Sequence, residues 1–167
     1  NLFDNASAKV DEWIPVKSGT DAALALAMCN VVIKDGSVDE AFLKRVSCAP
    51  FFVRDDTDKY LRESDLVEGG AEDKFAVFDK KAGKVVFMPR GTEHDYDWGE
   101  VDPALDYAGE VEGIACKTAY NRMVESIAEW TPEAQEKVTG VPAQQCVDFA
   151  RELAAKPLLM CIGNGLR

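Results

Sequence analysis

Positive charge is scarce in this sequence. Lys and Arg number 19 against 30 Asp and Glu, which gives a formal net charge of −11. Proteins gain most of their affinity for DNA and RNA from clustered Lys and Arg, which displace the counterions of the phosphate groups. The acidic balance therefore argues against nucleic acid and against an anionic membrane surface as partners.

Long apolar runs are also missing. The longest one, residues 22–33, is interrupted by Asn30 and is shorter than the roughly 18 to 20 residues that a membrane-spanning helix needs. We therefore expect no direct insertion into a membrane. The chain opens without a basic segment followed by an apolar one, so no targeting signal is visible and the compartment stays open.

Metal-binding side chains are few and scattered. The sequence has one histidine, and its five cysteines include no Cys-x-x-Cys pair. Zinc and iron-sulfur sites need grouped ligands, so we predict no metal ligand and no catalytic residue in this chain, and we expect buried, reduced thiols. His94 lies among acids and a threonine, where either an acid-base role or a solvated loop would fit. Asp55, Asp56 and Asp58 are spaced somewhat like a calcium loop, but the glycine and glutamate of such a loop are out of register.

The sequence does have the composition of a globular domain, with 47% apolar and 29% charged residues over 167 positions. Periodicity predicts helices at about 22–35, 40–46 and 118–130, a fourth starting at Thr131-Pro132 and a fifth after Pro142. Apolar runs at 75–78 and 85–88 predict a β-hairpin, and the run at 158–162 predicts a strand buried on both faces. We therefore predict an α/β fold, a parallel sheet with flanking helices. One domain would span residues 1–167, with an insertion at about 48–108.

The ends of the first two helices carry recognisable capping signals. Thr20 is the expected N-cap of the first helix, and Gly36 stands where a left-handed C-terminal cap would lie. Residues 37–40 form a capping box for the second helix.

The first of these helices also begins with the most informative local motif, Ser18-Gly19-Thr20-Asp21. Gly19 allows close approach to the backbone, and the first-turn N–H groups of a helix lack carbonyl partners. The Asp21 carboxylate can accept two N–H bonds side by side, the pattern that the N1–H and N2–H edge of guanine offers. The same residues would also serve simply to start a buried helix.

A second glycine turn, Gly163-Asn164-Gly165, follows the predicted strand at 158–162. Ligands of α/β sheets bind beyond the carboxyl ends of strands, so this turn could cradle a phosphate. It lacks the spacing of a dinucleotide-binding loop, and a plain tight turn fits it equally.

Several segments together resemble the molybdopterin oxidoreductases of the dimethyl sulfoxide reductase family. Residues 11–28 are similar to a family stretch that contains Pro-Gly-Thr-Asp, with Ser18 in place of the proline. Residues 31–42 resemble the segment that follows it. Further similarity covers Trp-Thr-Pro-Glu at 130–133, Val-Thr-Gly-Val-Pro at 138–142, residues 150–154 and the glycine turn at 163–165. Residues 48–108 match the family much less well.

The resemblance implies a fragment of the Rossmann-like, three-layer domain of a large catalytic subunit. That domain cradles one guanine dinucleotide of a bis(molybdopterin guanine dinucleotide) cofactor with molybdenum or tungsten. By this resemblance Gly19, Thr20 and Asp21 would bind the cofactor, and Asp21 would recognise its guanine base. Asn164 and Gly165 would make a second contact with the cofactor. The family's iron-sulfur cysteines and metal ligand have no counterpart in this chain, so the isolated chain should be inactive.

The resemblance further implies a whole enzyme of anaerobic respiration that carries out two-electron redox chemistry or oxygen-atom transfer. The remaining domains of the same subunit, and an iron-sulfur electron-transfer subunit, would be its partners. Family members are cytoplasmic or exported in the folded state. The alternative hypothesis is a free-standing acidic α/β interaction module that keeps the fold and has no cofactor.

Overall fold

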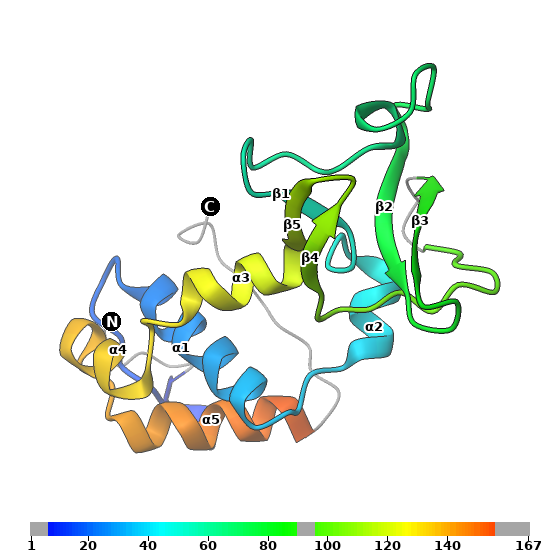
Figure 1. Ribbon diagram of the computed structural model, residues 1–167. Helices are drawn as coiled ribbons and strands as arrows, with labels where there is room; N and C mark the ends of the chain where they lie inside the picture. Colours follow the sequence, from blue (N-terminus) through cyan, green and yellow to red (C-terminus); the bar gives the residue numbers. More distant parts are fainter. Residues whose placement is uncertain (1–6, 90–95, 156–167) are drawn as a thin grey trace. The chain divides into compact units, whose positions relative to one another are not determined.

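The computed structural model describes residues 7–89 and 96–155, which fall into two compact units (Figure 1). The first unit comprises Asn1–Val38 and Ser126–Arg167, and the second comprises Asp39–Glu125. The β-rich insertion expected at about 48–108 lies within the second unit. Among the described residues no helix is both long and apolar enough to cross a membrane.

The first unit is built on α1 (Asp21–Lys34), which packs against α4 (Pro132–Thr139) and α5 (Ala143–Ala155) (Figure 1). Its core consists of small and apolar side chains from all three elements and from the segment that precedes α1, namely Leu24, Ala27, Val141 and Cys146 with Ile14, Val16 and Met28. The three helices predicted for this part of the chain are confirmed.

The predicted helix ends in the first unit are largely confirmed. Gly36 is left-handed at φ +67°, directly after the last residues of α1. Thr131 caps α4 by accepting a hydrogen bond from the Ala134 amide, with Pro132 in the first turn. Gly140, at φ +78°, ends α4 in the left-handed conformation.

A buried amide links α1 to the end of α3 (Ala119–Ile127) and the residues that follow it. Asn30 is 4% exposed, and its Nδ2 donates to the carbonyl oxygens of Trp130 at 2.9 Å and Ile127 at 3.2 Å. Carbonyls at the end of a helix have no partner within the helix. The Asn30 amide therefore satisfies groups that would otherwise be buried without a hydrogen bond.

The second unit holds the β-structure and two helices. Its elements in chain order are α2 (Glu40–Val46), β1 (Phe52–Arg54), β2 (Lys74–Asp79), β3 (Lys84–Pro89), β4 (Ala108–Val111), β5 (Ile114–Thr118) and most of α3 (Ala119–Ile127). Strands β1, β5 and β4 form one sheet in that order, and β2 and β3 form another.

The capping box predicted at 37–40 is wrong in its detail. α2 begins at Glu40, and the cap is Asp39, whose carboxylate accepts the Phe42 amide at 2.9 Å. Asp39 lies one residue before the helix, which is the position where a side-chain oxygen reaches the N3 amide.

Both sheets are antiparallel, so the parallel sheet that the sequence predicted is not found among the described residues. The reason is topological: β2–β3 and β4–β5 are joined by short turns, whereas parallel pairing needs a crossover of a dozen or more residues. The coarser prediction of a mixed α/β fold is confirmed, and β2 and β3 form the predicted hairpin. The strand predicted at 158–162 lies outside the described residues.

The hairpin of β4 and β5 was not predicted. Its strands are joined by Glu112 and Gly113, both at positive φ, which is the geometry of a tight two-residue turn. The Asn-Gly and Asp-Gly pairs that usually announce such turns are absent here, and the strands are only four and five residues long.

Aromatic rings fill the core of the second unit. The Tyr107 ring stacks between Phe52 and Phe78, with centroid distances of 4.8 and 4.7 Å. The segment after residue 95 also packs on α2. There the Trp98 indole Nε1 donates to the Lys44 carbonyl at 2.9 Å and stabilises the end of this short helix.

We predict that Asn30→Ala lowers the free energy of unfolding by about 1 to 3 kcal/mol, because buried carbonyls lose their donor. Chemical denaturation of the purified protein measures this change. Ala25→Ser, one turn away on the exposed side of α1, is the matched control and should cost much less. Equal stability of the Asn30 variant and the wild type would contradict the role given to this amide.

A second prediction concerns acid stability and Asp79, which is 6% exposed at the end of β2. Burial raises the pKa of Asp79, but the backbone N–H groups of Asp102, Lys81 and Ala82 outweigh it, so that the pKa lies below its ordinary value. A carboxylate with a lowered pKa stabilises the fold above its unfolded-state pKa, and the stabilisation disappears as pH falls through the folded-state pKa. In Asp79→Asn, the free energy of unfolding should therefore decrease less than in the wild type as pH falls below about 4. Denaturation at a series of pH values measures this decrease. The same pH dependence of unfolding in the variant and the wild type would contradict the stabilising role of the Asp79 carboxylate.

Candidate functional site

The turn before α1 is where the sequence placed its main candidate site. The Thr20 amide donates to the Lys17 carbonyl at 3.1 Å, which closes a four-residue turn with Ser18 and Gly19 in its centre. Gly19 has φ +80°, whereas Ser18 is not among the residues with positive φ, so the turn is of type II. Among the described residues, a Cβ at Gly19 would meet no atom within 4 Å, which leaves this backbone open to close approach.

Thr20 and Asp21 continue directly from this turn into α1. Thr20 occupies the predicted N-cap position, but its hydroxyl donates to the Lys17 carbonyl at 2.7 Å instead of accepting an amide of the helix. Asp21 is exposed in the first turn, and no hydrogen bond or ion pair occupies its carboxylate within the described residues. The site thus offers a free carboxylate beside first-turn N–H groups, a donor and acceptor set suited to a polar, partly anionic ligand.

The turn is fixed to the rest of the first unit by a backbone hydrogen bond. The Lys17 amide donates to the Thr139 carbonyl at the end of α4, at 3.1 Å. The sequence did not predict this contact. The two segments are far apart in the chain, and no local pattern pairs them.

Asn164 and Gly165 lie outside the described residues, as does His94.

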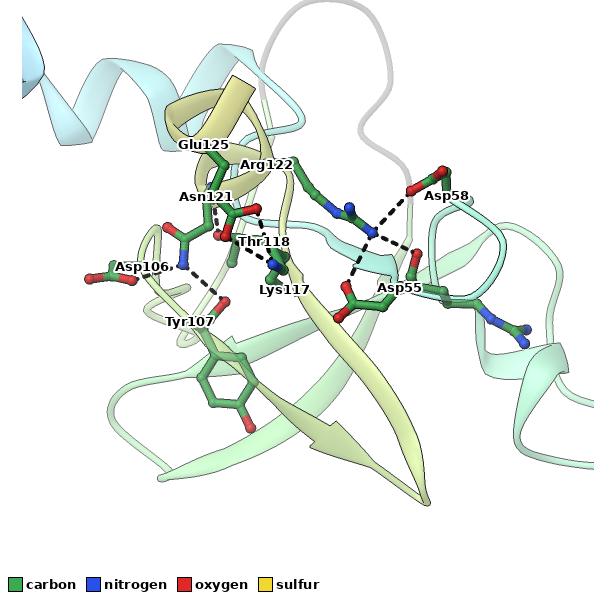
Figure 2. Close-up of polar contacts among 10 residues, drawn as sticks. Asp55, Asp58, Asp106, Tyr107, Lys117, Thr118, Asn121, Arg122 and Glu125 are labelled. Atoms are coloured by element: carbon green, nitrogen blue, oxygen red, sulfur yellow. Dashed lines mark hydrogen bonds and ion pairs between the residues drawn. The ribbon is translucent and has the colours of Figure 1, made fainter. Parts of the chain in front are cut away.

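The three aspartates with calcium-like spacing all form ion pairs with arginines. Asp55 and Asp58 both pair with Arg122 Nη2, at 3.1 and 3.0 Å (Figure 2). The two carboxylate oxygens of Asp56 accept from Nε and Nη2 of Arg54, at 2.9 and 2.7 Å. Ion pairs of this kind leave no open set of acidic oxygens. The loop is better described as an ion-pair network that holds the start of α3 against the segment after β1.

The four cysteines that the structure describes likewise show no grouping suited to a metal. Among the described residues no three His, Cys, Asp or Glu side chains lie close enough together to hold an ion. Cys116 and Cys146 are buried as predicted, whereas Cys29 and Cys48 are exposed, so the expectation of burial is wrong for that pair. Burial, with a contribution from the Asp55 charge, raises the pKa of Cys116 to about 11, which keeps it a neutral thiol.

Comparison with known proteins gives a consistent set of relatives. The chain is 37% identical over 192 residues to the perchlorate reductase subunit alpha of Dechloromonas aromatica (strain RCB), a match that covers 98% of this chain. It is 38% identical over 142 residues to the chlorate reductase subunit alpha of Ideonella dechloratans, and 36% identical over 165 residues to the dimethylsulfide dehydrogenase subunit alpha of Rhodovulum sulfidophilum. These matches cover 83% and 95% of the chain. No family model matches it.

The chain spans only about a fifth of the length of these relatives, with 21%, 16% and 18% of each covered. The similarity therefore concerns one segment of a much longer subunit in each case.

The type II turn generates two opposite predictions for its central residues. Gly19→Ala should destabilise the fold by about 1 kcal/mol, because the cost is backbone strain at positive φ without any clash. Ser18→Pro should stabilise it by about 0.5 kcal/mol, because proline suits the second position of this turn and restricts the unfolded chain. Thermal unfolding of both variants checks these signs, and stabilisation by Gly19→Ala would show that the turn is not of type II.

Proposed function

Since this chain belongs to the molybdopterin oxidoreductases of the dimethyl sulfoxide reductase family, as a homologue of their alpha subunits, we propose that it forms part of their cofactor site. The relatives are reductases and a dehydrogenase by name, so the chain is a segment of an oxidoreductase subunit. The family implies a molybdenum-containing cofactor. The finer proposal is that the turn before α1 binds a guanine nucleotide end of that cofactor.

The residues present at the turn fit such a group. Guanine offers two adjacent N–H donors, and the Asp21 carboxylate has two acceptor oxygens with no other partner among the described residues. The open space at Gly19 allows a ligand to approach the backbone closely, and the first-turn amides of α1 are available as donors to oxygen atoms. The single observation that carries the proposal is this unpartnered carboxylate on a fixed turn.

These contacts suggest a separate role for each of the three residues. Asp21 would bind and orient the base, Thr20 would support the turn through its bond to Lys17, and Gly19 would leave room for the ligand. When bound, the cofactor supplies two-electron redox chemistry or oxygen-atom transfer. This chain's own contribution is to hold one end of the cofactor.

The family resemblance supports further proposals about the cofactor, the domain and the partners. We propose a bis(molybdopterin guanine dinucleotide) cofactor, with Asn164 and Gly165 as a second contact. We also propose that the first unit belongs to a Rossmann-like domain with a parallel sheet, into which the second unit is inserted. The remaining domains of the subunit, and an iron-sulfur subunit, are the proposed partners, in line with the alpha-subunit names of the relatives.

The test is Asp21→Ala in the full-length subunit, with cofactor content as the measurement. We expect the molybdenum and the guanine nucleotide released per polypeptide to fall about tenfold or more, since charged hydrogen bonds are worth about 1.5 to 3 kcal/mol. Asp148→Ala removes an exposed carboxylate from α5 in the same unit and is the matched control, with wild-type content expected.

Full cofactor content in the Asp21 variant would refute the proposed site. A cofactor-free interaction module makes a different prediction, because wild-type protein from its source would then contain neither molybdenum nor guanine nucleotide. The same measurement on the wild type therefore separates the two hypotheses.

A further inference from the structure

The turn that carries the candidate site depends on the backbone of one residue, Lys17. Its carbonyl accepts both the amide and the hydroxyl of Thr20, at 3.1 and 2.7 Å. Its own amide donates to the Thr139 carbonyl at 3.1 Å. The peptide groups on either side of Lys17 therefore transmit the position of Thr139 to Thr20 and to the start of α1.

Thr139 is in turn held by a closed network of buried side chains. Its hydroxyl donates to Gln135 Oε1 at 2.6 Å and accepts the Val141 amide at 3.0 Å. Gln135 Nε2 donates to the carbonyls of Val141 at 2.9 Å and Pro132 at 3.0 Å. Gln135 is 0% exposed and Thr139 is 1% exposed, so each of these polar groups needs its partner.

The chain reversal after α4 brings this network against the turn. Gly140 has φ +78°, and a Cβ at this position would lie 3.5 Å from Lys17 Cε. The carbonyls in the last turn of a helix have no intrahelical partner, and the Lys17 amide supplies one for Thr139. The backbone conformation at the end of α4 and that of the turn at residues 17–20 therefore depend on each other.

We propose that Thr139 and Gln135 are positioning residues for the nucleotide site, which they do not touch. This inference rests on the proposed function of Gly19, Thr20 and Asp21. The buried network fixes the Thr139 carbonyl, the carbonyl fixes the Lys17 amide, and the Lys17 carbonyl fixes Thr20 next to Asp21. Loosening the network should therefore weaken cofactor retention without removing any group that contacts the cofactor.

The experiment compares full-length, cofactor-loaded subunits in mild urea, below the unfolding transition, and follows the loss of guanine nucleotide over time. Thr139→Val removes the hydroxyl but keeps the shape of the side chain. We expect guanine loss to accelerate about tenfold, since misaligned hydrogen bonds act mainly on the dissociation rate. Thr139→Ser restores the hydroxyl and should return the rate to within about twofold of wild type.

The matched control is Asn30→Ala, which destabilises the same unit through a different buried amide. If Thr139 mattered only for stability, both variants would release guanine at similar rates. Hydrogen exchange of the Lys17 and Thr20 amides gives a second readout, with faster exchange expected in Thr139→Val and not in Asn30→Ala. Should Thr139→Val fail to fold, Lys17→Pro removes the amide that donates to Thr139, and the same acceleration is expected. Lys17→Ala removes the lysine side chain but keeps the amide, so it is the control for this variant and should retain guanine as the wild type does.

The outcomes separate this inference from the function on which it rests. Wild-type retention in Thr139→Val or Lys17→Pro, together with rapid loss in Asp21→Ala, would overturn the positioning role alone. Wild-type retention in Asp21→Ala would refute the nucleotide site itself. Rapid loss in both Thr139→Val and Asn30→Ala would also overturn the positioning role, because general instability would then explain it.

Discussion

The first unit is organised by the need to bury α1. Ala, Leu, Met, Val and Ile cover most sides of this helix, so other elements must pack around it to remove that surface from water. Helices α4 and α5 and the segment before α1 supply most of that cover. Because Asn30 lies among these apolar residues, its amide must find partners inside the core, and the carbonyls after α3 provide them.

The second unit relies more on pairing of charges and rings than on one long helix. Arg122 lies between Asp55 and Asp58, and Lys44 contacts Asp102 at 3.1 Å. The bond to Lys44 outweighs burial and holds the pKa of Asp102 below its usual range, so this pair stays charged near neutral pH. An acidic chain with few basic residues thus uses them to hold segments that are distant in sequence.

Features with local causes could be predicted from the sequence. The start of α4 follows from Thr131 and Pro132, and the β2–β3 hairpin follows from two apolar runs around a polar turn. The motif at residues 18–21 could also be recognised, because it is a local pattern at the start of a helix. Contacts between residues that are distant in sequence could not be predicted in this way. No local pattern indicated that the Thr139 carbonyl would accept the Lys17 amide. The β4–β5 hairpin was missed because its turn lacks the usual Asn-Gly or Asp-Gly pair.

The Asp21 carboxylate, which has no hydrogen-bond partner within residues 7–89 and 96–155, also determines which base the proposed site would prefer. A carboxylate offers only acceptors, so it matches an edge with two donors and opposes adenine, whose edge pairs a donor with an acceptor. Because the turn is held by backbone bonds, the identity of this one side chain can change without disturbing the loop. An amide at position 21 would present one acceptor and one donor, and the preference of the site would shift from guanine towards adenine.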